Sequence, residues 1–436
     1  MSQFRLARLS LLLAAIGLNA VPALVTSAHA QAAAAPAAAP KAETIRKEMF
    51  ALLDPVKVKE LMAGKKFDQI QANIVAAEAF PNLTAYETYV IDRMKVALGS
   101  TTGNDKMAMA ALESVIKSGR ADKADNLDFM IALGEYNYRA KDYPKSIEWF
   151  KRYQAESPTP DKARTSLSRA QYFNNDFAGA RPALEAIIAD AEKAGQRPQL
   201  DDLRLLASSV GKLNDKTAYA AVIEKLVANY PSNEYWTDML RRMQSKPGFN
   251  QRLTLDALRL QSVAQKEMSA DEYVLMAELA LRGGFFTEAK KAVDAGYAKG
   301  VLGKGAGAGA HKQLQDRATK GAADDAKTIN AGEAAAVAAK TGQPMVNLGH
   351  AFVTMDQYDK GIALIEKGIA KGGLKNPEDA KLRLGSAYAM AGKKAEALKA
   401  FADIKGSDGT GDLARYWTMY LNAPAAGAAP ATAATN

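Results

Sequence analysis

One spacing recurs along this chain and constrains its fold more than any other feature. A Leu-Gly pair is followed, twelve residues after the glycine, by a small residue, and a bulky apolar residue comes four positions later. The three clearest instances are Leu133-Gly134 with Ser146 and Phe150, Leu348-Gly349 with Gly361 and Ile365, and Leu384-Gly385 with Ala397 and Phe401. Small residues placed between bulky ones let two antiparallel helices cross closely and interlock. The recurrence therefore predicts a solenoid of stacked helix pairs, a fold that usually acts through an extended surface.

The segment at residues 126–158 shows how one such pair is built. Leu133, Gly134 and Asn137 follow at the three- and four-residue spacing of one helix face. Pro144 suits the first turn of a second helix, where its missing N–H has no partner to lose. Phe150 then faces back toward the first helix. The sequence thus predicts a helix, a short turn and a second helix that returns along the first.

This pattern resembles the tetratricopeptide repeat, whose copies recur every 34 residues. Gly134 and Ser168 are separated by that period, and the best-matching copy contains Leu384, Gly385, Tyr388, Ala397 and Phe401. No copy has the tryptophan that opens the family pattern. The resemblance implies an all-α fold over residues 42–422, a right-handed superhelical solenoid of helix-turn-helix repeats. Its clearest copies are expected at residues 126–158, 160–193, 200–231, 270–300, 342–373 and 378–405.

Two wider gaps between copies each fit two periods, so each is expected to hold a degenerate unit. The first unit would use residues 233–244 and 249–261, and the second would use residues 310–320 and 322–340. In the copy at residues 200–231, Tyr219 stands in a slot that normally takes a small residue, which predicts a locally splayed pair. The alternative is an irregular helical bundle. It explains the helical pattern but not the near-constant spacing.

The two ends of the chain differ from the rest in composition. Arg5 and Arg8 precede an apolar run, and Ala28-His29-Ala30 is a small-x-small cleavage site, so residues 1–30 are expected to be a signal peptide cleaved after Ala30. Residues 31–41 form an Ala/Pro-rich linker and residues 423–436 an Ala-rich tail, and both are expected to be disordered. We expect a protein of the Gram-negative periplasm, or alternatively a secreted one, with no transmembrane segment after processing.

Composition narrows the chemistry. The chain has no cysteine and three histidines, one of them in the expected signal peptide, which argues against thiol chemistry and a multi-histidine metal site. The net charge of +9 is modest for 436 residues, and basic and acidic residues alternate along the expected helices. Nucleic-acid binding would need clustered cations. We therefore expect no cofactor, no metal, no nucleic-acid partner and no enzyme activity.

The resemblance implies that the first helix of each repeat turns toward a concave groove. Mapped onto this chain, those slots form a basic and aromatic strip with one histidine: Tyr138, Arg139, Arg169, Tyr172, Phe173, Arg204, Lys212 and His350. Tyrosine and arginine bind well because they combine broad contact with hydrogen bonding. We expect the strip to take an extended segment carrying acidic groups. In the alternative, the tyrosines pack between repeats and the arginines are solvated.

The function favoured by these features is a non-catalytic scaffold or assembly factor that binds partner proteins or extended peptides. One alternative is an accessory subunit that recruits or regulates a cell-wall enzyme. Another is a binder of a small lipid or glycan, because the later copies offer a more apolar groove with Val346, Val353 and Leu382. The identity of the partner and the oligomeric state do not follow from the sequence.

Overall fold

The computed structural model describes residues 43–423, and within that range the chain is all-helical with no strand. This confirms the all-α prediction. The expected signal peptide, residues 1–30, and the linker, residues 31–41, lie outside the described residues, as does the tail beyond Ala423. The described residues form two compact units, 43–184 and 185–423, and each is described by itself.

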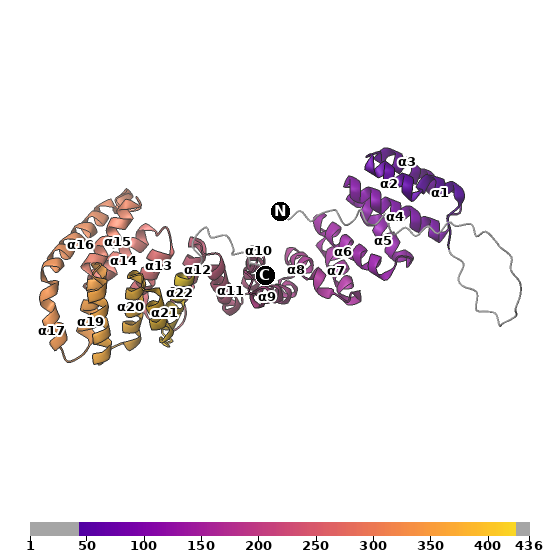
Figure 1. Cartoon of the computed structure of the whole chain (residues 1–436). Coiled ribbons are helices and arrows are strands. Elements are labelled where there is room, and N and C mark those ends of the chain that lie inside the picture. The colour runs from indigo at the N-terminus through magenta and orange to yellow at the C-terminus, as the bar shows by residue number, and fades with distance from the viewer. Residues whose placement is uncertain (1–42, 424–436) are drawn as a thin grey trace, which may run out of the picture. The chain divides into compact units, whose positions relative to one another are not determined.

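The described part of unit 1 is a stack of antiparallel helices (Figure 1). A capping box at Thr84, with Glu87 at the third helical position, begins the long helix α4, and Asp142 caps α7 through the Lys145 N–H. The helices are α1 (Lys47–Leu53), α2 (Pro55–Ala63), α3 (Phe67–Glu78), α4 (Ala85–Thr102), α5 (Asp105–Ser118), α6 (Lys123–Arg139), α7 (Tyr143–Glu156), α8 (Arg164–Phe173) and the start of α9 (Phe177–Lys193), with a 3₁₀ turn at Pro160–Ala163.

The recurring glycines mark close helix crossings. A Cβ atom added at Gly134 of α6 would lie 2.4 Å from Cε1 of Phe150 in α7, so the phenylalanine ring occupies the space of the missing side chain. The Ser146 hydroxyl donates a hydrogen bond of 2.8 Å to the Gly134 carbonyl, which satisfies a buried polar group at the same crossing. The Phe150 ring therefore fills the space left by the missing Gly134 side chain. This fit explains why a glycine and a bulky apolar residue recur at the same spacing.

Unit 2 is built from helices stacked in the same way. They are the rest of α9, then α10 (Leu200–Lys212), α11 (Lys216–Asn229), α12 (Asn233–Gln244), α13 (Thr254–Ala264), α14 (Ala270–Arg282), α15 (Phe286–Ala298), α16 (Ala308–Thr328), α17 (Gly332–Ala338), α18 (Gln343–Thr354), α19 (Tyr358–Lys371), α20 (Pro377–Met390), α21 (Lys394–Ala402) and α22 (Thr410–Asn422), with 3₁₀ turns at Gln251–Leu253, Gly305–Gly307 and Ile329–Ala331.

Of the two degenerate units, one lies where the sequence predicted it and the other does not. Helix α12 covers residues 233–244, and α13 follows as its partner. The predicted break near residue 321 is wrong, because α16 runs unbroken through it and only the short α17 follows. The reason is packing: Gly321 lies against Phe286 of α15, where a Cβ atom would meet the ring at 2.5 Å. The glycine serves a helix contact there and does not end a helix.

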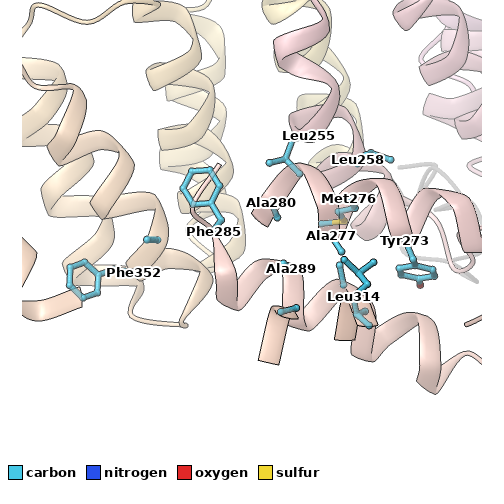
Figure 2. Packing of buried hydrophobic residues seen from close by; sticks show 14 of the residues in the cluster. Leu255, Leu258, Tyr273, Met276, Ala277, Ala280, Phe285, Ala289, Leu314 and Phe352 are labelled. Atoms are coloured by element: carbon cyan, nitrogen blue, oxygen red, sulfur yellow. The ribbon is translucent and has the colours of Figure 1, made fainter. Parts of the chain in front are cut away.

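One cluster of buried hydrophobic residues in unit 2 runs from α13 to α19. Figure 2 shows Leu255 and Leu258 of α13 near Met276 and Ala277 of α14, with Leu314 of α16 below them, all in one buried cluster. Each helix buries its face against the next, so no single central core is needed. These stacked pairs confirm the solenoid prediction; the right-handed sense of its superhelix stays a prediction.

The stack in unit 2 closes on itself, which the sequence did not indicate. After α20 and α21 the chain returns, so that α22 packs on α11, α13 and α20 (Figure 1). The Asn250 N–H donates to the Asp408 carbonyl at 2.9 Å. Arg252 binds both carboxylate oxygens of Asp379 at 2.8 Å and also binds Asp408. We call residues 251–422, joined at these contacts, the closed stack.

Candidate functional site

The residues of the predicted strip lie in two units and in different surroundings. Tyr138, Arg139, Arg169, Tyr172 and Phe173 belong to unit 1, and the other three belong to unit 2. Nothing in either unit tests their role in binding, which stays a prediction. Their positions divide them into an aromatic cluster, a pocket and a buried histidine.

Aromatic rings gather at the turns of two consecutive helix pairs in unit 1. The rings of Tyr138, Tyr143, Tyr172, Phe173 and Phe177 contact one another at centroid separations of 5.3–6.0 Å. Phe173 is 46% exposed, so the cluster presents an apolar surface. Tyr143 and Phe177 were missed from the sequence because they begin second helices, whereas the predicted slots lie on first helices. Their place directly after the turns, as in Asp142-Tyr143 and Asp176-Phe177, was the available signal.

The charged members of the strip in unit 1 are already engaged. Arg139 pairs with Asp105 at 3.1 Å, and its guanidinium lies 4.5 Å from the ring centroid of Tyr136. Burial raises the pKa of Tyr138, and the positive charge of Arg169 opposes that rise. Part of this face therefore fits the alternative, in which tyrosines pack between repeats. Tyr136 is 4% exposed, and its hydroxyl donates a hydrogen bond to the Ser100 hydroxyl.

Unit 2 contains a pocket of about 750 Å³ between α10, α11 and α12, which we call the α10–α12 pocket. Arg204, one of the predicted strip residues, lies in its wall, together with Ser208, Tyr219, Glu234, Tyr235 and Arg241. Tyr219, the oversized residue of this copy, packs beside Gly211, where an added Cβ atom would lie 3.3 Å from its ring. A large side chain in a small-residue slot thus coincides with an open space between these helices.

Polar groups in and beside the α10–α12 pocket form two separate sets of contacts. The Arg204 Nε donates to the Tyr235 hydroxyl at 2.9 Å, and this hydrogen bond raises the pKa of Arg204. On the other side, Arg242 lies 4.0 Å from the ring centroid of Tyr219 and holds both oxygens of Asp238 at 3.0 Å. Burial, and then the Asp238 carboxylate, raises the pKa of Tyr219. The pocket therefore offers fixed donors and acceptors beside aromatic faces.

His350 corrects the prediction that it faces a groove. It is 1% exposed, and its ring meets Phe285 edge-on at 5.0 Å. Neither ring nitrogen has a hydrogen-bond partner among the described residues. Burial, with Arg259 and Arg383 adding repulsion, holds its pKa well below the usual value. Phe285 lies against the ring, and Arg259 of α13 and Arg383 of α20 lie over Phe285, so this face of α18 is filled.

The apolar late groove is filled as well, here by the neighbouring helix α19: added Cβ atoms at Gly368 and Gly361 would lie 2.8 Å and 2.6 Å from the Val346 and Val353 side chains. Val346, Val353 and Leu382 are at most 1% exposed and belong to the core. The inner face of the closed stack instead carries a buried ion network, in which Arg259 binds both oxygens of Glu288 at 2.7 Å and Asp256 at 2.6 Å. A lipid or glycan would find no open groove at these positions.

The remaining predicted positions are easily located. Lys212 is exposed in the last turn of α10. The residues predicted to pack repeats together lie at helix–helix contacts: Leu133, Gly134, Ser146 and Phe150 between α6 and α7, Leu348 and Gly349 on α18, and Leu384, Gly385, Tyr388, Ala397 and Phe401 in the α20–α21 pair.

Two searches of residues 43–423 gave negative results. No group of three or more histidine, aspartate or glutamate side chains in this range is arranged to hold a metal ion. No helix there is long and apolar enough to cross a membrane.

Comparisons with known proteins agree with the repeat pattern. The sequence model of the tetratricopeptide repeat family matches residues 108–159 and 346–411. A comparison with curated proteins gave no match. Among solved structures, the chain is similar to one titled "Structure of Naa15/Naa10 bound to HypK-THB", with 14% sequence identity and a TM-score of 0.29. The match covers 85% of this chain and 66% of that chain, so this chain spans just under two thirds of the length of that one. It is also similar to yeast Tom70, with 12% identity and a TM-score of 0.20, over 86% of this chain and 96% of that chain. At these TM-scores the two structures carry no argument about arrangement or function.

Proposed function

We propose that this chain is a member of the tetratricopeptide repeat family, whose sequence model matches residues 108–159 and 346–411. On that premise we propose that it is a non-catalytic scaffold that holds a partner protein through an extended segment. Proteins built from such repeats generally bind other proteins through the surface that the stack creates. The proposal assigns the partner segment to the α10–α12 pocket of unit 2.

The chemistry of that pocket is the observation that carries the proposal. A peptide needs donors for its carbonyl groups, acceptors for its N–H groups, and aromatic faces for its side chains. Arg204 and Arg241 supply donors, Glu234 and Asp238 supply acceptors, and Tyr235 supplies a hydroxyl already oriented by Arg204. Tyrosine and arginine are also the residues that most often dominate binding energy at protein interfaces. An enzyme site would instead need a nucleophile, a base and an orienting group within hydrogen-bond reach of one another.

The proposal includes export to the periplasm of a Gram-negative bacterium. Its support is the sequence of residues 1–30, with Arg5 and Arg8 before an apolar run and Ala28-His29-Ala30 at its end. N-terminal sequencing of the protein purified from its native envelope tests this part, and a mature chain that does not begin at Gln31 would contradict the expected cleavage.

Site-specific photo-crosslinking tests the scaffold proposal. A photoreactive residue in place of Glu234, which is exposed and lines the pocket, should capture a defined protein in intact cells. The same residue in place of Lys299, exposed at the end of α15 and away from the pocket lining, is the matched control. Arg204→Glu should reduce the adduct formed at position 234, because it reverses the charge of the pocket wall.

Two outcomes would overturn the scaffold proposal. The first is an adduct pattern at position 234 that is no different from that at position 299. The second is capture of a glycan or lipid in place of protein.

A further inference from the structure

A second hollow lies where the closed stack meets the helices before it. It has a volume of about 1010 Å³ and is walled by α11, by the C-terminal half of α12, and by Arg415 of the returning helix α22. We call it the seam hollow. Its size is at the upper end of the range for binding clefts. Its lining shares only Asp238 and Arg241 with the α10–α12 pocket, because the two open over different faces of α11.

Cations dominate the lining of the seam hollow. They are Lys216, Arg241, Arg242, Lys246 and Arg415. Three carboxylates balance part of this charge: Asp238 pairs with Arg242 at 3.0 Å, Asp412 with Lys246 and Arg415 at 2.9 Å, and Glu224 with Arg415 at 2.7 Å. Five cations against three carboxylates leave two positive charges in excess.

The two cations in excess can be identified. Lys216 and Arg241 are exposed, and neither forms an ion pair within residues 43–423. They lie on different helices, α11 and α12, which border the same hollow. Glu272 feels the charge of Arg241 but forms no ion pair with it. A ligand with two negative groups would therefore find two cations that are not in ion pairs, beside three that are held in place by carboxylates.

The rest of the lining leaves room for a backbone. Ala220 and Ala221 of α11 and Pro247 present small or rigid apolar surfaces, and Thr217 offers a hydroxyl. Small side chains allow a main chain to approach closely, while long cations around it reach its side chains. This combination fits an acidic segment with short residues between its carboxylates better than a bulky ligand.

We propose that the seam hollow binds an acidic peptide segment of a partner protein, with Lys216 and Arg241 pairing with its carboxylates. This site goes beyond the α10–α12 pocket, with which it shares Asp238 and Arg241; Lys216 belongs to the seam hollow alone. It also depends on closure, because Arg415 comes from α22 and follows Lys246, the last of the other cations, by 169 residues in the sequence. An open stack would lack one wall of the site.

The test uses the full mature chain and two labelled peptides. One alternates glutamate with alanine, and the other has glutamine in place of each glutamate. The acidic peptide should bind in fluorescence anisotropy, the glutamine peptide should not, and added salt should weaken binding because exposed charges are screened. Lys216→Gln and Arg241→Gln should each lower the affinity about two- to fivefold, and the double variant about tenfold, as expected for exposed ion pairs.

Matched variants separate this site from the others. Lys299→Gln removes an exposed lysine far from the hollow in sequence and should leave the affinity unchanged. Arg204→Gln changes only the α10–α12 pocket and should also leave it unchanged. If Arg204→Gln abolishes peptide binding while Lys216→Gln does not, the peptide lies in the other pocket and the seam proposal is overturned.

Three further results would overturn it. They are equal affinity for the two peptides, an unchanged affinity in the double variant, and binding of inorganic phosphate alone in the hollow without any binding of the peptide. Failure of the scaffold proposal would appear separately, in the crosslinking from position 234, so the two proposals can fail independently.

Discussion

Helices α18 and α19 cross with backbone against backbone, and one added methyl group should disrupt the crossing. A Cβ atom at Gly349 would lie 2.6 Å from the Gly361 carbonyl oxygen and 2.9 Å from the Ile365 nitrogen. Both contacts are backbone atoms of α19, which cannot move aside as a side chain does. Gly349→Ala should therefore force the two helices apart.

The expected cost follows from two opposing terms. Overpacking in a tight core costs about 1–3 kcal/mol, and the rigid neighbours place this site at the upper end. Replacing glycine by alanine inside a helix returns up to about 1 kcal/mol. The net expectation is a loss of about 2 kcal/mol in the free energy of unfolding. Gly309→Ala in α16 is the matched control, since a Cβ atom there meets nothing within 4 Å and should be neutral or slightly stabilising.

Urea denaturation followed by tryptophan fluorescence measures the effect. Trp236 and Trp417 are buried in unit 2 and report its unfolding, and Trp149 lies in unit 1. Because two units need not unfold together, hydrogen exchange over α18 and α19 should accompany the titration. A Gly349→Ala variant as stable as the wild type, or no difference from Gly309→Ala, would refute the reasoning.

The remaining predictions concern other contacts. Gly134→Ala should cost about 1–2 kcal/mol, since the new Cβ atom meets the buried Phe150 ring, and adding Phe150→Leu should recover part of the loss in urea titrations. Arg252→Gln should destabilise unit 2 by about 1.5–3 kcal/mol and speed hydrogen exchange at residues 410–422, because two carboxylates lose their cation; unchanged exchange there would contradict this. His350 binds its proton more weakly in the folded than in the unfolded chain. The wild type should therefore lose free energy of unfolding as pH falls below about 6.5, by at most about 1.4 kcal/mol per pH unit. Denaturation at pH 7.5 and 5.5 should show this loss in the wild type and not in His350→Leu.

Asp408, which binds Arg252 where the stack closes, should make stability depend on pH in a more acidic range than His350 does. Burial alone would raise the pKa of Asp408, but hydrogen bonds from Arg252 and Thr410 outweigh it and lower that pKa to about 2. Because the folded pKa is below the ordinary value, this carboxylate stabilises the closed stack fully above about pH 4, and the contribution is lost as pH falls through about 2. Acid titration of Asp408→Asn beside the wild type measures the difference, and identical curves would show that the carboxylate does not contribute.

Local features of the fold were predictable because they depend on neighbours in sequence. The spacing from Gly134 to Phe150 is set by one helix pair, so a single segment contains all the information about that crossing. Turn residues and helix caps are local in the same way; Asp142, for example, caps α7 within one turn. The family pattern adds the stacking of one pair on the next.

Closure of the stack was not predictable because it depends on partners far apart in sequence. Arg252 and Asp408 are separated by 156 residues, and neither segment has a sequence feature that identifies the other as its partner. Some slots that the family pattern assigns to a groove are interior in this chain. Val346 packs against Gly368 of α19, and His350 meets Phe285 beside Arg259 of α13 and Arg383 of α20. Only part of the aromatic cluster could be predicted. Phe173 lies on the first helix of its pair, where the family pattern assigns binding slots. Tyr143, which stacks on it, begins a second helix, where the pattern assigns none.

The central claim is that residues 251–422 of unit 2 form a closed stack, and a distance between its first and last helices tests the claim most directly. The chain has no native cysteine, so Asn250→Cys and Ser407→Cys can carry the only two spin labels. The Asn250 N–H donates to the Asp408 carbonyl at 2.9 Å, so the two labelled Cα atoms should lie within about 10 Å. Four helix pairs separate α13 from α22, and an open stack with helices spaced 8–10 Å apart would place them on the order of 40 Å apart. Pulsed electron resonance in solution should give a single short distance; a distribution centred near the longer value would contradict closure.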